Sequence, residues 1–276
     1  FEPIPDLLKS MRYNQSHQHD ICKQARLRHP TRTSRHGDGD RKTIDEFFPK
    51  NLLSHTPSSG LVEPLLPPMR HQNFCVSKSG YDLLRLDYLI HDFEAMCQQL
   101  KPFSRRVLID MGASLSFHEG DQPMIVLMNW YKKFGFRFDH IYAFEKTFKS
   151  PEEVYKNLLP KEYMASYHWI NVGVNHTQGN KLNPFNSILE KFEVDDFIVV
   201  KLDIDTSFIE VPLAHQLLED KDGLYSGRID QFYFEHHVHL GELRPSWGES
   251  MNGSIKDSFE LFHGLRQKGI PAHFWP

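Results

Sequence analysis

Apolar residues follow two different spacings along the chain. From Tyr81 to Leu100 they recur at steps of three and four, which is typical of one face of an amphipathic helix. Further on they gather in short runs that end in a polar residue and predict strands, at 106–110, 139–145, 167–174, 197–203 and 230–235. Helical patterns separate most of these runs, at 122–134, 151–159, 209–218 and 259–267, and a last extended segment covers 270–275.

The alternation of strands and helices from residue 105 onward predicts an α/β fold with a Rossmann-like, doubly wound and mostly parallel sheet. Right-handed crossovers would bring the carboxyl ends of the strands to one edge, where α/β proteins bind their ligands. The predicted strands end in four carboxylates and one amide: Asp110, Glu145, Asn171, Asp203 and Glu235. Each residue alone could cap a following helix, but the five together predict a polar ligand site.

The first 80 residues differ from the rest, because hydrophobic periodicity is nearly absent there. Nine basic residues fall between positions 9 and 42: Lys9, Arg12, Lys23, Arg26, Arg28, Arg32, Arg35, Arg41 and Lys42. We therefore divide the chain into an irregular basic extension, 1–80, and an α/β domain, 81–276. The extension is interpreted as a solvated or loosely docked arm, and binding to a protein partner through this arm is the alternative.

The composition supports one large globular domain with an appendage. Hydrophobic residues make up 39% and charged residues 25% of the 276 positions, which excludes a disordered or collagen-like chain. The net charge of −4 gives no reason to expect a nucleic-acid partner. No apolar run approaches the ~18–20 residues of a membrane span.

Cysteines and glycosylation motifs bear on the compartment. Cys22, Cys75 and Cys97 match no zinc-binding spacing, and they are either free thiols or a Cys75–Cys97 disulfide with Cys22 left over. Three N-x-[ST] sequons are present, at Asn14, Asn175 and Asn252. These motifs favour the secretory pathway or an extracellular location.

Four strand ends resemble the motifs of the FkbM type of S-adenosylmethionine-dependent methyltransferases. The run Asp110–Ser116 resembles the family's D-x-G-A-N-x-G, and Glu145 stands where its second strand ends in Glu-Pro. Lys201–Thr206 is similar to K-I-D-x-E-G, and Glu235 matches the acidic end of the fifth strand. The resemblance covers roughly residues 105–240 in the family's order.

This resemblance implies S-adenosylmethionine as the cofactor and a fold of the class I methyltransferase type. The residues expected to bind the cofactor are Asp110, Gly112, Ala113, Ser114, Glu145 and Asn171. Gly112 would let the backbone approach the cofactor closely, and the Glu145 carboxylate would accept hydrogen bonds from ribose hydroxyls. The acceptor would be a small molecule or carbohydrate that offers a hydroxyl or carboxyl group, and the residues expected to face it are Asp203, Glu235 and His236.

Histidines follow the fifth predicted strand, in the run Glu235-His-His-Val-His239. His237 and His239 would point the same way along an extended chain, and with Asp203 or Asp205 they are candidate ligands of a divalent ion. We do not expect a resident metal, because a hydrogen-bonded histidine run at a strand end explains the same residues. A catalytic base is the other role for one of these histidines.

Departures from the family motifs keep two other functions open. Ser116 replaces the second glycine of the first motif, and its side chain would intrude on the cofactor site. The chain would then be an inactive methyltransferase fold that acts as a structural or interaction subunit. Asp203-Ile-Asp205 also resembles the D-x-D motif of metal-dependent glycosyltransferases.

Overall fold

The computed structural model describes residues 34–35, 41–42, 54–56, 60–63, 86, 89–113, 123–238 and 251–275. The chain divides into two compact units, which are described one at a time. Unit 1 comprises residues 1–100 and 121–137 with Pro276, and unit 2 comprises residues 101–120 and 138–275. Most of the predicted arm lies outside the described residues, and its boundary at residue 80 stays a prediction.

Short antiparallel strand pairs occur in the described part of the arm. One pair joins β1 (Ser34–Arg35) to β2 (Arg41–Lys42), and the other joins β3 (Ser54–Thr56) to β4 (Gly60–Val62). Neither strand pair belongs to the large sheet of unit 2.

The helix predicted over 81–100 is wrong in its extent. Among the described residues of this segment, helix α5 covers Phe93–Gln99. Asp92 is its N-cap and accepts a hydrogen bond from the backbone N–H of Ala95 at 3.1 Å. Ile90 is buried but precedes the cap in a non-helical segment. Apolar residues spaced three and four positions apart therefore occur here in a buried segment that is not helical, and this is why the predicted helix was too long.

An aromatic cluster forms part of the core of unit 1. Helix α6 (Pro123–Lys133) follows the predicted boundaries closely, and its residue Tyr131 belongs to this cluster. Phe93 stacks on Phe134 with ring centroids 3.9 Å apart and an interplanar angle of 7°. The rings of Tyr131 and Phe136 meet Phe93 at centroid distances of 5.8 and 5.7 Å.

Cys97, in α5, is disulfide-bonded. Its partner lies outside the described residues. The alternative of three free thiols is therefore wrong, and the pairing with Cys75 stays a prediction.

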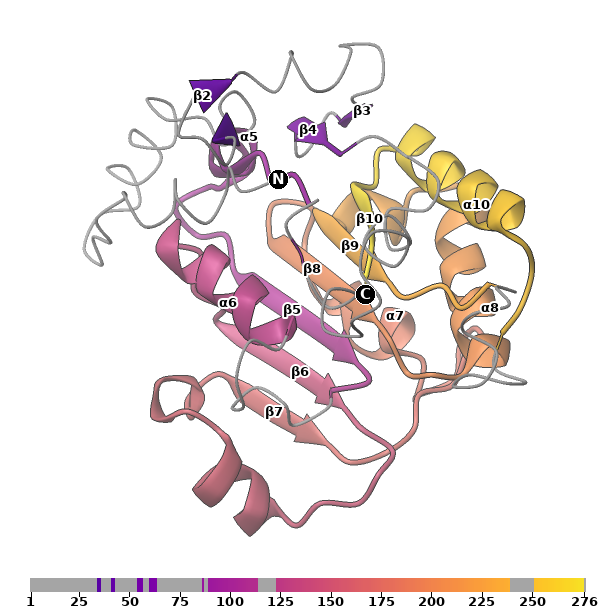
Figure 1. Cartoon of the computed structure of the whole chain (residues 1–276). Helices are drawn as coiled ribbons and strands as arrows, with labels where there is room; N and C mark the ends of the chain where they lie inside the picture. Colours follow the sequence, from indigo (N-terminus) through magenta and orange to yellow (C-terminus); the bar gives the residue numbers. More distant parts are fainter. Residues whose placement is uncertain are drawn as a thin grey trace. The chain divides into compact units, whose positions relative to one another are not determined.

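In the described part of unit 2, six strands form one sheet: β5 (Arg106–Met111), β6 (His140–Phe144), β7 (Tyr167–Ile170), β8 (Phe197–Leu202), β9 (Gln231–Phe234) and β10 (Ala272–Phe274). All neighbours are parallel, in the order β10-β9-β8-β5-β6-β7 (Figure 1). The chain builds outward from β5 in one direction and then, from β8, in the other, as in Rossmann-like folds. The predicted α/β fold is confirmed.

The centre of the sheet is apolar because its strands are covered on both faces. All six residues of β8 are buried, in agreement with its run of apolar residues, which only Lys201 interrupts. The predicted sixth strand is confirmed as β10, which pairs in parallel directly with β9. Among the described residues no strand separates β9 from β10.

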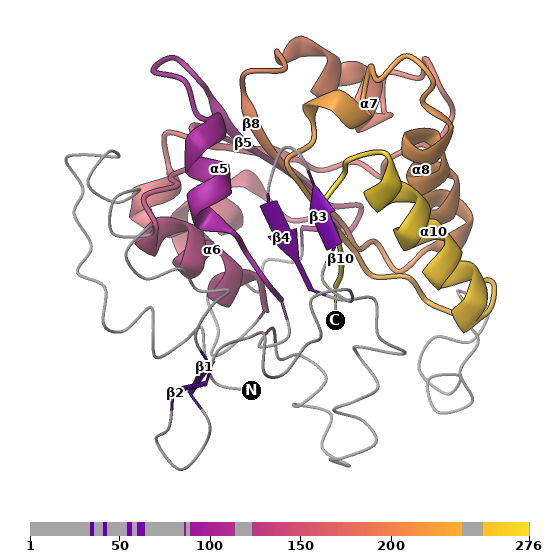
Figure 2. The same cartoon turned by 90° about the horizontal axis from the view of Figure 1, so that it is seen from above.

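Helices α8 (Ser207–Glu219) and α10 (Ile255–Gln267) confirm two further predictions and lie side by side (Figure 2). They lie close together at Gly264, where an added Cβ would lie 2.7 Å from Leu218 Cδ1. The helix predicted at 151–159 is a short π-helix, Glu153–Leu158, and a single turn, α7 (Pro184–Ser187), follows β7. None of the described helices is long and apolar enough to span a membrane.

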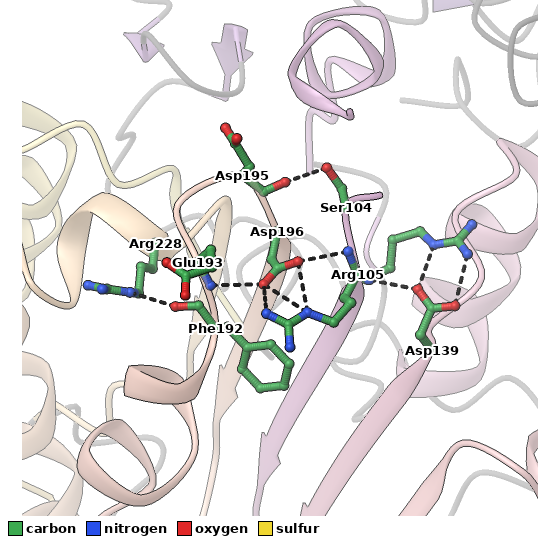
Figure 3. A network of polar contacts seen from close by, with 9 residues as sticks. Ser104, Arg105, Asp139, Phe192, Glu193, Asp195, Asp196 and Arg228 are labelled. Atoms are coloured by element: carbon green, nitrogen blue, oxygen red, sulfur yellow. Dashed lines mark hydrogen bonds and ion pairs between the residues drawn. The ribbon is translucent and has the colours of Figure 1, made fainter. Parts of the chain in front are cut away.

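Ion pairs link the amino ends of three neighbouring strands (Figure 3). Asp196, which precedes β8, accepts hydrogen bonds from the backbone N–H of Arg105 at 2.8 Å and from its guanidinium group. Arg106 and Asp139 form a second pair between the starts of β5 and β6, with Nη2 and Oδ1 2.9 Å apart. The carboxyl edge, where the ligand site is predicted, lies at the other end of these strands.

Candidate functional site

A cavity of about 370 Å³ opens at the carboxyl edge of the sheet. Residues from four successive loops line it: Gly112 after β5, 145–147 after β6, 172–174 after β7 and 203–206 after β8. The volume falls within the range of roughly 300–1,000 Å³ found for small-molecule sites. The cavity also lies where the strand order reverses between β5 and β8, which is the usual ligand position in such sheets.

Gly112 allows two of these loops to approach each other. Its φ of +86° is unfavourable for residues with a side chain, and an added Cβ would lie 1.6 Å from the carbonyl oxygen of Asp203. The backbone N–H groups of Gly112 and Ala113 both donate to the carbonyl of Phe144, at 3.0 and 2.9 Å. The sequence predicted that this glycine lets the backbone approach a cofactor. In the structure its backbone also lies against the ends of β6, at Phe144, and β8, at Asp203.

Glu145 is half-buried and lines the cavity. One carboxylate oxygen, Oε1, accepts a hydrogen bond from the backbone N–H of Thr147 at 2.6 Å. Asn171 holds this loop, because its Nδ2 donates to the carbonyls of Glu145 and Thr147 at 2.7 and 2.8 Å. Its Oδ1 accepts from the backbone of Lys149 at 3.0 Å. Asn171 is thus placed to position Glu145 and is not among the residues that line the cavity.

Asp110 is almost fully buried and is paired with Lys201, its neighbour in register on β8. Lys201 Nζ lies 3.1 Å from Asp110 Oδ1 and 3.0 Å from Asp203 Oδ2, and it donates to the carbonyl of Gly112 at 3.1 Å. Burial lowers the pKa of Lys201, but the two carboxylates outweigh burial and the pKa is raised. The lysine is therefore charged and fixes the turn that contains Gly112.

Asp203 connects this ion pair to Glu235 at the end of β9. Trp275 Nε1 donates to Asp203 Oδ2 at 3.0 Å, on the oxygen that also faces Lys201. Burial raises the pKa of Asp203 well above its usual range; Lys201 opposes this shift, whereas the neighbouring Glu235 adds to it. Of these two carboxyl groups, Asp203 lines the cavity and Glu235 does not.

Asp205, Glu235 and His237 bring three potential ligand atoms together. His237 Nε2 lies 3.0 Å from Glu235 Oε2 and 3.7 Å from Asp205 Oδ1, and the three atoms lie within 4.8 Å of one another. Glu235 and His237 are buried, whereas the side chain of Asp205 is 70% exposed and lines the cavity. Asp205 has a φ of +53°, a backbone conformation that Asp adopts more readily than most residues.

Glu210, in the first turn of α8, fixes the loop that carries Asp205. Its two carboxylate oxygens accept hydrogen bonds from the backbone N–H groups of Ile204 at 2.7 Å and Thr206 at 3.1 Å. The side chain is fully buried, and burial raises its pKa to about 7.

His236, predicted to be catalytic, points into a different cavity, which it lines with His215 and Asn252. Its ring stacks on Phe234 at a centroid distance of 5.1 Å, and burial lowers its pKa to about 4. Alternation along the extended chain places Glu235 and His237 on the other side. Two further predicted residues, Ser114 and His239, lie outside the described residues.

Lys201, Glu210 and Trp275 contribute to the site but were not predicted as site residues. The sequence carried a signal for one of them, since a charged lysine inside the run 197–203 needs a buried partner. Glu210 and Trp275 gave no comparable signal, because their contacts depend on how α8 and the chain end fold back on the sheet edge.

No protein-family model matches this chain, and no curated protein and no solved structure shows significant similarity to it.

Proposed function

We propose that unit 2 binds S-adenosylmethionine in the cavity at the carboxyl edge and transfers its methyl group to an oxygen atom of an acceptor. The observation that carries this proposal is the cavity itself, where the glycine turn after β5, the acidic end of β6 and the acidic end of β8 meet. Three of the four segments that resemble the FkbM motifs therefore line one space of suitable size, and the fourth, at Glu235, does not line it.

Each lining segment has a physical role in this proposal. Glu145 would accept hydrogen bonds from the ribose hydroxyls, and Asn171 would keep its loop in place. The turn at Gly112 would lie against the methionine portion. The exposed Phe208 and the residues 172–174 offer apolar surface for the adenine ring.

The transfer step would be a direct displacement. A bond forms between the acceptor oxygen and the methyl carbon, the carbon–sulfur bond breaks, and its electron pair stays on the sulfur, which becomes a thioether. The acceptor hydroxyl gives its proton to the carboxylate of Asp203, which lines the cavity and whose pKa is raised by burial. Holding donor and acceptor in line would supply much of the rate enhancement.

The test is calorimetric titration of the whole chain with S-adenosylmethionine and with its demethylated product. We expect saturable binding, and we expect Glu145→Gln to weaken it about 10- to 100-fold, since a hydrogen bond to a charged group is worth about 1.5–3 kcal/mol. Glu219→Gln is the matched control, because Glu219 is exposed at the far end of α8 and outside the cavity. The absence of binding at millimolar ligand would contradict the proposal.

Two alternatives from the sequence are separated by an assay of turnover and by a titration with a sugar nucleotide. An inactive methyltransferase fold that serves as a scaffold predicts no turnover even where the donor binds. A D-x-D glycosyltransferase predicts binding of a sugar nucleotide that depends on Mn²⁺. The first carboxylate of this motif, Asp203, is held by Lys201 and Trp275, whereas the second, Asp205, lies near His237.

A further inference from the structure

We propose that Asp205, Glu235 and His237 bind a divalent transition-metal ion at the rim of the cavity. The sequence favoured a hydrogen-bonded histidine run without a resident metal, and the geometry of the described residues points to the other interpretation. Binding of the ion does not depend on the proposed methyl transfer. The use of the ion in catalysis does rest on that function.

The spacing of the three ligand atoms fits one ion. Ligands about 2.1 Å from a metal, at angles between 90° and 110°, are separated by roughly 3.0–3.4 Å. The separation of 3.0 Å between His237 Nε2 and Glu235 Oε2 lies at the lower limit of this range, and that of 3.7 Å between His237 Nε2 and Asp205 Oδ1 lies slightly above it. A small movement of the exposed Asp205 side chain would bring all three ligand atoms within bonding distance of one ion.

The charges at this edge also favour a cation. Four carboxyl groups face two basic side chains in the contacts described above: Asp110 and Asp203 lie beside Lys201, and Asp205 and Glu235 lie beside His237. Lys201 supplies one positive charge, and it is already held by Asp110 and Asp203. Asp110 and Glu235 are buried, and a buried carboxylate is costly unless a cation or a proton compensates its charge.

The ligand set and its burial indicate which ion would bind and what it would do. One imidazole and two carboxylates suit Mn²⁺ or Zn²⁺ better than Ca²⁺ or Mg²⁺, which prefer oxygen ligands alone. Glu235 and His237 would hold the ion from the protein side, and Asp205 would face the cavity. Open coordination positions on that side suit an acceptor with neighbouring oxygen atoms, whose hydroxyl the ion would acidify.

The ligation of Asp205 is tested by titrating the whole chain with MnCl₂, followed by electron paramagnetic resonance of free Mn²⁺. We expect one site that Asp205→Asn weakens at least about tenfold, since even outer-shell changes commonly cost 10- to 100-fold. Asn tolerates a positive φ, and this side chain is exposed, so the variant should fold. Asp222→Asn is the matched control, because Asp222 is exposed beyond the opposite end of α8.

The histidine ligand is tested without a buried substitution. Electron spin echo modulation of bound Mn²⁺ should show coupling to a nitrogen nucleus in the unaltered protein. An Mn²⁺ signal without nitrogen coupling, equal affinity in Asp205→Asn and the unaltered protein, or no binding at millimolar Mn²⁺ would each overturn the proposed site. Mn²⁺ binding without binding of S-adenosylmethionine would contradict the methyltransferase function and support the metal site. Binding of S-adenosylmethionine without Mn²⁺ binding would support the methyltransferase function and contradict the metal site.

Discussion

Gly112 combines a positive φ with close backbone packing, and both conditions exclude a side chain. We expect Gly112→Ala to destabilise the protein by about 3 kcal/mol or more, because the new Cβ would overlap the carbonyl of Asp203. The free energy of unfolding in urea measures the effect.

Gly227→Ala is the control for this substitution. An added Cβ at Gly227 meets no atom within 4 Å, so the cost should stay within roughly 0.5 kcal/mol. Equal unfolding free energies for Gly112→Ala and Gly227→Ala would contradict the described turn.

At the scale of single residues, the sequence predicted which positions are chemically important better than what each one contacts. Asp110 was expected at the cofactor, but its partner Lys201 depends on the register of β5 against β8, which the sequence does not reveal. His236 and His237 are neighbours of identical type, and their opposite directions follow from the pleat of the chain after β9.

At the scale of elements, the pairs at the amino ends of the strands should differ in strength. Asp196 is almost fully buried and accepts bonds from Arg105 and from the backbone of Glu193, whereas Asp139 is 39% exposed. We expect Asp196→Asn to cost about 1.5–3 kcal/mol at pH 7 and Asp139→Asn about 1 kcal/mol or less.

The cost of Asp196→Asn should also depend on pH. Burial raises the pKa of Asp196, but the hydrogen bonds from Arg105 and Glu193 outweigh burial and lower it below the ordinary value. The carboxylate therefore contributes its stability above about pH 4, and that contribution is lost as pH falls through the lowered pKa. Urea unfolding at pH 7, 5 and 3 should show a difference from the unaltered protein that shrinks only at the lowest pH. A difference that stays constant to pH 3 would contradict the pairing.

Strands that consist of one continuous run of mostly apolar residues were predicted well. A run whose residues have two different roles was not. The apolar runs at 106–110 and 197–203 became β5 and β8 nearly unchanged. The run 167–174 is a strand only as far as Ile170, because its second half leaves the sheet and lines the cavity. The apolar residues Val172 and Val174 line the cavity and do not extend the strand.

At the scale of the whole molecule, the disulfide at Cys97 determines how many cysteines remain as free thiols. The chain has three cysteines, so the unfolded, unreduced protein should show one free thiol and the reduced protein three. Titration with a thiol reagent measures both values. Peptide mapping should then join Cys97 to Cys75, as the sequence predicted. Three reactive thiols before reduction would contradict the disulfide, and a link to Cys22 would contradict the pairing.

The ties at the amino ends of β5, β6 and β8 restrict where unit 2 is able to deform. Strands fastened at one end do not slide past each other, so any adjustment to an incoming molecule falls on the turns at their free ends. Asp110 and Lys201 would then stay opposite each other whether the cavity is filled or vacant. Their ion pair would not have to break and form again each time a ligand binds.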